Sequence, residues 1–369
     1  MVSLLNAIDR ETYDVTLWIA SPHGVFMPQV PADVKVLTDW RIEALGQNFG
    51  GMTKLLCHGC IFLALGSLLR MVLSRVSKAW ASRLLAWLMP SIGEAEYDLI
   101  VDYNGQQQLY YMVNKLNGKK KVSFFHSDYS KWDYYYSADK KYYAYVDAIF
   151  TISQMCVDVL KQYFPQYTDK IGIIENITSP ELLAKLSAEP FVSPWRENTL
   201  KLISLGHVTD LKGAHWAIEA AHILKEHDVD FQWVFVGLVQ DRAKYNTMIM
   251  QWGLQDNIIF AGIQANPYTY VKTADILVHP SQFEGKSIAL DEAKLLCKPI
   301  VVTNFSTVGD QFMNRVNATI CEMTPISIAD SIEELANDDA LRNHYVEYLS
   351  EHKVDNTSII VEIYQLMSE

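Results

Sequence analysis

Residues 276–292 read ILVHPSQFEGKSIALDE, and this stretch decides both the fold and the candidate site. The apolar run Ile276–Val278 predicts a buried strand, and Ile288–Leu296 predicts the helix that follows it. Between them, Gly285 and Ser287 leave backbone N–H groups unshielded where the helix begins. The start of a helix carries partial positive charge, so the sequence predicts an anion site suited to a diphosphate.

Two carboxylates accompany this anion site. Glu284 precedes the predicted helix at the mouth of the site, and Glu292 lies about two turns along on the same side. One carboxylate can reach a sugar beside the phosphates, and the other can reach ribose hydroxyls. Glutamate is common on helices, so the pair is informative only because a strand and Gly285 precede it.

Strands and helices alternate along almost the whole chain. Strands are expected at Asp14–Ala20, Val34–Leu37, Asp98–Asp102, Lys121–Phe125, Ala148–Ile152, Ile171–Ile174, Leu200–Leu205, Phe231–Val236, Ile258–Ala261, Ile276–Val278 and Pro299–Val302. Helices are expected at Gln106–Leu116, Cys156–Tyr163, Ala214–His227, Arg242–Trp252 and Ile288–Leu296. This alternation predicts an α/β protein with two Rossmann-like, doubly wound parallel sheets that face a cleft.

Domain limits follow from a stretch without periodicity. Residues 188–194 contain two prolines and are expected to form the linker. The predicted domains are therefore residues 1–190 and 195–350, with a C-terminal helix over 351–369 that packs back toward the first domain.

Composition excludes several classes of protein. The 369 residues include 31 basic and 43 acidic side chains, and a net charge of −12 argues against a nucleic-acid binder. Five scattered cysteines fit a reducing compartment, so we expect a cytoplasmic protein. No signal peptide is expected, and the longest stretch of low charge, residues 55–69, is too short to span a membrane.

One segment differs in charge from its surroundings. Residues 44–93 contain no acidic side chain but include Lys54, Arg70, Arg75, Lys78 and Arg83. Apolar residues recur among them at helical spacing, so residues 54–87 are typical of helices that lie in the surface of an anionic membrane. A core-facing helix pair with a solvated basic face is the alternative.

A second phosphate-binding element follows the strand Leu200–Leu205. Gly206 and Gly213 bracket a loop that leads into the next helix, and Lys212 in this loop could neutralise the diphosphate without a metal ion. An ordinary loop lysine is the alternative.

Three other motifs are incomplete in this sequence. Gly285-Lys286-Ser287 resembles the end of a P-loop, but Pro280 stands where that motif needs its first glycine. No G-x-G-x-x-G follows any strand. Cys57 and Cys60 have zinc-knuckle spacing without a second ligand pair, so no metal site is expected.

Together these residues resemble the retaining GT-B glycosyltransferases of family 4, the glycosyl transferases group 1. Glu284 and Glu292 match the family's E-x7-E signature, and the loop from Gly206 to Gly213 matches its phosphate loop. Residues 260–263 resemble the strand and turn that hold the nucleotide base through Ile263, and Ser153 and Asn176 match positions of the first domain. The wording of residues 284–294 is most similar to bacterial enzymes that build capsular or other surface polysaccharides.

The resemblance implies a reaction and a set of roles. Such enzymes move a sugar from a nucleotide diphosphate donor, here expected to be a UDP-sugar, to an acceptor hydroxyl with retention and without a metal ion. Lys212 and the N–H groups of Ser287, Ile288 and Ala289 would stabilise the leaving diphosphate. Glu284 would orient the donor sugar and Glu292 the ribose, while His126 would face the sugar from the first domain.

Two departures from the family pattern stand out. His207 occupies the place of a usual arginine, so one positive charge is expected to be missing, and Lys286 is a candidate substitute. The chain also begins within the family's first helix, so the central first strand and a glycine-rich loop are expected to be absent. Either the start codon lies too far downstream or the protein is truncated and weakly active.

The acceptor is inferred from the basic segment. A membrane-facing surface in the first domain suggests a peripheral enzyme at the inner face of the cytoplasmic membrane, with a glycan or lipid-linked acceptor. The main alternative is a catalytically weak or silent GT-B subunit that binds the membrane or a partner enzyme. A nucleotide-sugar epimerase is a more distant alternative.

Overall fold

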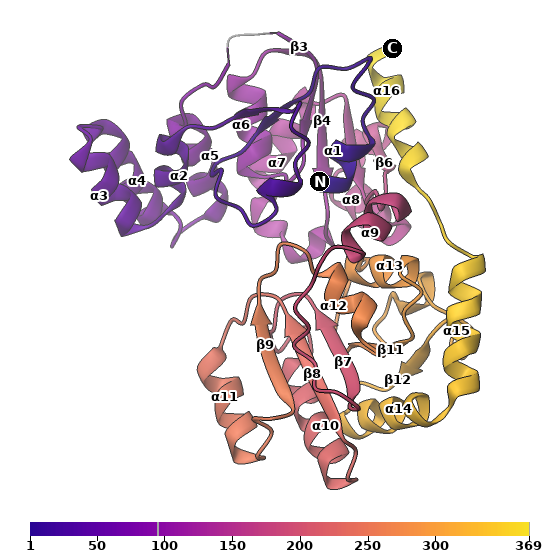
Figure 1. Cartoon of the computed structure of the whole chain (residues 1–369). Coiled ribbons are helices and arrows are strands. Elements are labelled where there is room, and N and C mark those ends of the chain that lie inside the picture. The colour runs from indigo at the N-terminus through magenta and orange to yellow at the C-terminus, as the bar shows by residue number, and fades with distance from the viewer. Residues whose placement is uncertain (94–95, 369) are drawn as a thin grey trace. The chain divides into compact units, whose positions relative to one another are not determined.

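The computed structural model describes residues 1–93 and 96–368, which divide into two compact units. The first unit comprises Met1–Ile177 with Thr357–Glu369, and the second comprises Thr178–Asn356 (Figure 1). The boundary at Ile177 falls before the linker predicted from the prolines. Helix α9 (Pro180–Ser187), expected in the first domain, instead packs on α12 (Tyr268–Thr273) of the second unit.

The second unit is built on a parallel sheet of six strands in the order β12-β11-β10-β7-β8-β9. The strands are β7 (Leu200–Leu205), β8 (Phe231–Val236), β9 (Ile258–Gly262), β10 (Ile276–His279), β11 (Ile300–Thr303) and β12 (Thr319–Cys321). Most are continuous runs of large apolar residues, as expected for strands that are covered on both faces. The neighbours β7 and β10 run in the same direction, so both end at the same edge of the sheet.

Helices cover both faces of this sheet. One apolar core lies under α10 (Ala214–Glu226), α11 (Arg242–Gln251) and α14 (Pro325–Asn337), which is followed by α15 (Asp339–Glu351). The other core lies under α12 and α13 (Ile288–Leu295). The second unit is therefore doubly wound, as the alternation of elements predicts.

The strands of the first unit form two separate parallel sheets. A two-stranded sheet pairs β1 (Thr16–Trp18) with β2 (Lys35–Leu37). A four-stranded sheet has the order β3-β4-β5-β6, with β3 (Tyr97–Asp102), β4 (Gly118–Phe125), β5 (Ala148–Thr151) and β6 (Ile171–Ile173). Both sheets are parallel, as expected, but among the described residues they do not join into one sheet.

The helices of the first unit lie between its strands and at its C-terminal end. They are α1 (Val2–Ala7), α2 (Trp40–Gly46), α3 (Phe49–Cys57), α4 (Ile61–Leu73), α5 (Lys78–Leu88), α6 (Gln107–Lys115), α7 (Tyr136–Tyr142), α8 (Gln154–Tyr163) and α16 (Ile360–Ser368). Tyr364 of α16 stacks on Tyr13, and its hydroxyl accepts the backbone N–H of Asp9 at 2.8 Å. These contacts tie α16 to the first unit. Glu369, the end of the predicted C-terminal helix, lies outside the described residues.

The basic segment forms three helices. Lys54 lies on α3, Arg70 on α4, and Lys78 and Arg83 on α5, with a turn after Cys57 that the sequence did not predict. Helices α3 and α4 lie side by side at one end of the first unit (Figure 1). None of the helices in the described part of the chain is long and apolar enough to cross a membrane.

Candidate functional site

The candidate site lies where the loops after β7 and β10 meet. The strand order reverses at β7, which pairs with β10 on one side and with β8 on the other. The carboxyl ends of β7 and β10 are therefore the switch point of the sheet, where doubly wound proteins bind ligands. The backbone N–H of Gln282 donates to the carbonyl of Leu211 at 3.0 Å, which joins the two loops. Gly213 has a φ of +70°, and a Cβ there would lie 1.8 Å from the Pro280 carbonyl oxygen. Only glycine permits this close approach.

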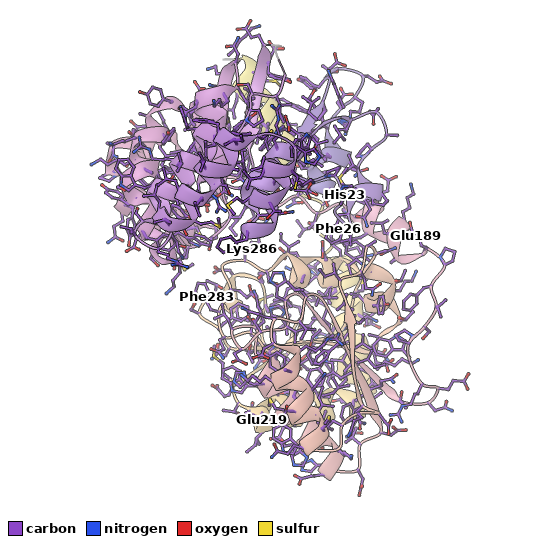
Figure 2. All side chains as sticks on the ribbon, turned by 90° about the vertical axis from the view of Figure 1, so that its left-hand side faces the viewer. His23, Phe26, Glu189, Glu219, Phe283 and Lys286 are labelled. Carbon is purple, nitrogen blue, oxygen red and sulfur yellow. The ribbon has the colours of Figure 1, made fainter. Side chains whose placement is uncertain are left out.

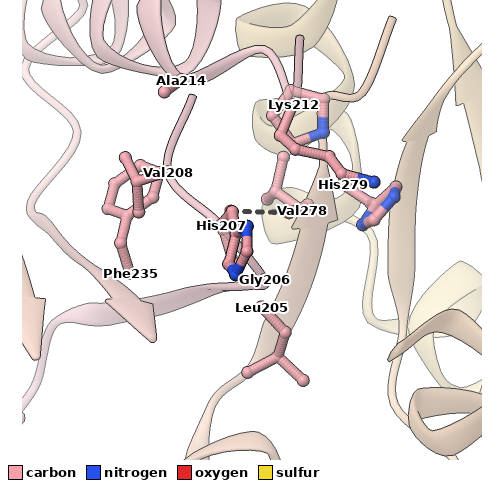
Figure 3. A pocket seen from close by; sticks show the side chains of 11 residues that line it. Leu205, Gly206, His207, Val208, Lys212, Ala214, Phe235, Val278 and His279 are labelled. Carbon is pink, nitrogen blue, oxygen red and sulfur yellow. Dashed lines mark hydrogen bonds between the residues drawn. The ribbon is translucent and has the colours of Figure 1, made fainter. Parts of the chain in front are cut away.

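Three charged or polar side chains converge at this junction. The Nζ of Lys212 lies 2.7 Å from each carboxylate oxygen of Glu284. The Nε2 of His279, the last residue of β10, lies 2.8 Å from Oε1 of the same carboxylate. Figure 3 shows Lys212, from the loop after β7, extending toward His279 at the end of β10. Glu284 is thus held from both sides, and its backbone carbonyl accepts the hydroxyl of Thr307 at 2.9 Å.

The charge state of Glu284 follows from these contacts. Burial alone would raise the pKa of this carboxyl group, but the hydrogen bond from His279 and the charge of Lys212 outweigh burial and lower the pKa to about 2. An ionised carboxylate accepts hydrogen bonds only, so Nε2 of His279 carries the hydrogen that lies between them. The Glu284 carboxylate is therefore ionised at neutral pH and is paired with the charge of Lys212.

The start of α13 supplies backbone donors. The N–H groups of Ile288 and Ala289 belong to the first turn, which has no acceptors within the helix. The N–H of Ser287, predicted to bind the diphosphate, instead donates to the side-chain oxygen of Gln311 at 3.1 Å. The amide nitrogen of Gln311 donates to the Ser287 carbonyl and to Asp291, so Gln311 fixes the helix start.

Glu292 lies on the same helix and is bound by a neutral donor. The hydroxyl of Tyr268 donates to Oε1 of Glu292 at 2.7 Å. Burial raises the pKa of Glu292 to about 7, against the opposing effect of this hydrogen bond. The two glutamates of the predicted pair therefore have different environments: Glu284 faces a lysine, whereas Glu292 faces a tyrosine.

Comparison with known proteins places this site in a family. Residues 187–352 match the model of the family "Glycosyl transferases group 1". Over these residues the chain is therefore similar to the glycosyl transferases group 1. The resemblance predicted from the glutamate pair and the glycine loop is confirmed.

Curated relatives share part of this domain. An uncharacterized glycosyltransferase of Methanocaldococcus jannaschii is 26% identical over 46% of this chain and 43% of its own length. The amylovoran biosynthesis glycosyltransferase AmsK of Erwinia amylovora is 29% identical over 32% of this chain and 31% of its own. The chain thus spans under half the length of these curated relatives.

Solved structures show the fold of the chain. A crystal structure of Anabaena HepE in complex with UDP and glucose is 17% identical, with a TM-score of 0.65, and covers 100% of this chain and 95% of that one. The fold is therefore GT-B, as predicted, with two Rossmann-like units.

The other predicted donor residues are distributed around the group 1 domain. His207 is exposed and lines a small cavity with Gly206, Lys212 and His279 (Figure 3). Ile263 follows the end of β9 and is exposed, and Lys286 lies in the loop between β10 and α13. Lys286 lies at one end of the second unit in Figure 2, whereas Glu219 of α10 lies toward the other end.

His126 follows β4 in the first unit, apart from the group 1 domain. Its ring lies over Tyr103, with centroids 4.5 Å apart, and stacks on Phe124. Both ring nitrogens are buried, and neither has a hydrogen-bond partner among the described residues. Burial lowers the pKa of His126 to about 4, so the imidazole is neutral at pH 7.

Sequence reasoning missed three residues that organise the site: His279, Tyr268 and Gln311. His279 carried a weak signal, because a polar residue that ends a buried strand points to the edge where ligands bind. The described residues contain no group of three or more His, Cys, Asp or Glu side chains that could hold a metal ion.

Proposed function

We propose that this protein is a retaining glycosyltransferase that moves a hexose-type sugar from a nucleoside diphosphate donor, of the UDP-sugar type, to a glycan or lipid-linked acceptor in the synthesis of a bacterial surface polysaccharide. The observation that carries the proposal is the cluster of Lys212, Glu284 and His279 at the switch point of the group 1 domain. Relatives named for polysaccharide biosynthesis support the choice of pathway class.

The first group of residues would bind the leaving diphosphate. The Nζ of Lys212 and the N–H groups of Ile288 and Ala289 would bind the phosphate oxygens, where negative charge develops as the sugar departs. Ser287 would join them only if its N–H were released by Gln311. Lys212, rather than a metal ion, supplies the positive charge in this proposal, and Lys286 is a second candidate cation.

The second role is that of the donor sugar. When Lys212 turns from Glu284 to the diphosphate, the carboxylate keeps the hydrogen bond from His279 and gains free acceptor positions for sugar hydroxyls. His126 would face the sugar from the first unit as a neutral imidazole. Glu284 is therefore the residue whose loss should damage transfer most.

The third role is that of the ribose. Glu292 would accept the ribose hydroxyls in place of the Tyr268 hydroxyl, with which it is paired in this structure. Ile263, exposed after β9, would contact the base.

Calorimetric titration with UDP, GDP and a panel of their sugar conjugates tests this proposal. We expect the full chain to bind one sugar conjugate, and we expect Glu292→Ala to abolish that binding. Glu219→Ala is the control, because Glu219 lies on α10, away from the Lys286 end of the unit (Figure 2). Binding that is equal in both variants would remove Glu292 from the donor site.

The second candidate function is a catalytically silent subunit, which is the conclusion if no nucleotide binds. One observation favours it: Lys212 and Glu284 already neutralise one another, and His207 adds no permanent charge. In that case the titration would show no heat with any nucleotide, although the chain remained folded.

A further inference from the structure

Helix α4 buries small side chains and exposes large apolar ones, which is the reverse of an ordinary surface helix. Its buried residues are Ala64 and Ser67, which are 2% and 0% exposed. Leu63 packs against the core, but six other large apolar side chains point outward, with 41–64% of each exposed: Ile61, Phe62, Leu65, Leu68, Leu69 and Val72. A helix that packs only against its own protein buries its large apolar residues and exposes its polar ones.

The packing of α4 on α5 explains which face is turned inward. A Cβ at Gly66 would lie 2.5 Å from a methyl group of Leu88, so the small residues allow the two helices to approach closely. The hydroxyl of Ser67 is buried there without a hydrogen-bond partner among the described residues. The inward face of α4 is thus filled, and its apolar stripe has nothing to cover it in the described part of the chain.

The apolar stripe continues onto α5. Trp80 and Trp87, seven residues apart and therefore on one face of the helix, are 59% and 57% exposed. The rings of Phe62 and Trp87 meet edge to face, with centroids 5.9 Å apart, so the two helices share one apolar surface. We call the outward faces of α4 and α5, with the turn between them, the α4–α5 surface.

Basic side chains border the α4–α5 surface, and carboxylates are missing from it. Arg75 and Lys78 are exposed around the turn, and the guanidinium of Arg83 lies 4.9 Å from the ring of Trp80. Residues 44–93 contain no Asp or Glu, although the whole chain carries a net charge of −12. The ion pairs of the described residues include none between Arg75, Lys78 or Arg83 and a carboxylate, and the Nζ of Lys78 lies 4.4 Å from the ring of Tyr134.

We infer that the α4–α5 surface docks on an anionic phospholipid bilayer, with the α4 stripe and the two tryptophans immersed in the headgroup region and the basic residues on lipid phosphates. Exposed apolar residues alone would fit several partners. The acid-free basic border in a strongly acidic protein selects a negatively charged one, and tryptophan beside basic residues suits the bilayer interface. The link between this surface and a lipid-linked acceptor rests on the proposed function, but docking itself does not.

Sedimentation of the full chain with vesicles tests the inference. We expect pelleting with vesicles of equal phosphatidylglycerol and phosphatidylcholine, weak pelleting with phosphatidylcholine alone, and loss of binding as salt is raised. The variant Phe62→Ser/Leu65→Ser/Leu69→Ser should lower partitioning at least about tenfold, because these side chains supply the buried apolar area. Its matched control is Met250→Ser/Ile326→Ser/Val346→Ser, which alters exposed apolar residues of the second unit.

The charge border is tested separately. Arg75→Gln/Lys78→Gln/Arg83→Gln should lower binding to the anionic vesicles by about 10²-fold at low salt. The control Lys140→Gln/Lys141→Gln/Lys353→Gln removes the same net charge from exposed positions elsewhere and should have little effect. Quenching by brominated lipids should depend on Trp80 and Trp87, which their replacement by phenylalanine would reveal.

Three outcomes would overturn the inference. In the first, the unmodified chain does not pellet with vesicles; in the second, the matched controls lose as much vesicle binding as the test variants. In the third, the chain binds no vesicles but forms a dimer, which Phe62→Ser/Leu65→Ser/Leu69→Ser converts to monomers. The last would assign the surface to a second copy of the chain. We expect nucleotide titration to be unaffected by the α4 and α5 variants, because they lie outside the group 1 domain, so failure of docking and failure of the proposed reaction are distinguishable.

Discussion

Two buried carboxylates, one in each unit, lie at or after the end of a parallel strand: Asp102 ends β3, and Glu284 lies in the loop after β10. Different donors hold them. Glu284 is bound by a lysine and a histidine, whereas Asp102, the last residue of β3, accepts the Ser123 hydroxyl at 2.7 Å and two backbone N–H groups. Burial raises the pKa of Asp102 to about 6, but the hydrogen bond from His279 and the charge of Lys212 lower that of Glu284 to about 2. A carboxylate held by side-chain donors can exchange a partner for a ligand, while one held by backbone donors stabilises the fold.

Replacing Glu284 by Gln should give the largest effect. The amide keeps the size of the side chain but removes the charge, so Lys212 loses its counterion and the sugar loses its acceptor. We expect transfer, measured as release of nucleoside diphosphate with acceptor present, to fall about 10²-fold or more. Asp102→Asn is the matched control and should leave transfer within about threefold. An equal loss in both variants would show that the two carboxylates do not differ in role.

The stability of the two variants should depend on pH in different ways. The pKa of Asp102 is raised from 3.8 to about 6, so ionisation costs the folded state on the order of 2–3 kcal/mol as pH rises from about 4 to 6. Asn does not titrate, so the advantage of the unmodified chain over Asp102→Asn should shrink across that window.

The contribution of Glu284 to stability changes with pH in the opposite direction. Its pKa is lowered from 4.5 to about 2, so its contribution to stability is present above about pH 4.5 and is lost as pH falls toward 2. Between pH 4.5 and 6, the difference in unfolding free energy should stay constant for Glu284→Gln while it falls for Asp102→Asn. Urea unfolding at several pH values measures both. Parallel slopes for the two variants would contradict the assigned partners.

His279 is a positioning residue that acts through Glu284, and its removal should have an intermediate effect. His279→Ala deletes a hydrogen bond to a charged group, so we expect turnover to fall about tenfold. The pKa of Glu284 should rise, which moves the acid limb of the pH–rate profile upward. His279→Gln retains an N–H donor and should restore both turnover and the acid limb. Acid limbs that coincide in all three proteins would make His279 a packing residue.

The sequence predicts those parts of the site that depend on the backbone alone. Parallel strands end at one edge, and a glycine permits close approach, so the meeting of Lys212 with Glu284 could be expected from strand order and composition. Tyr268 and Gln311 could not be predicted, because each reaches its partner from an element 20 or more residues away and depends on how the loops close.

In the fold, too, features set by local sequence are predicted and features set by distant contacts are not. The six-residue strands β7 and β8, in which apolar residues predominate, have the bounds that the sequence predicts. Strand β12, three residues long, was missed because so short a segment has no measurable periodicity. The spacing of α4 predicts an amphipathic helix but not which face is buried, since only its contact with α5 through Gly66 decides that.

The smallest expected effect adds a charge to the Glu284 site instead of removing one. His207 is exposed and lines the same small cavity as Lys212, and an arginine side chain is always charged, so His207→Arg should place a permanent positive charge near the bound diphosphate. An exposed ion pair contributes under about 1 kcal/mol, so nucleoside diphosphate affinity, measured by calorimetry, should rise about threefold and the gain should fade at high salt. The control His344→Arg changes net charge equally on exposed α15. If both variants gained affinity alike, the effect would belong to the overall field of an acidic protein; a gain confined to His207→Arg would mean that the diphosphate lies beside Lys212.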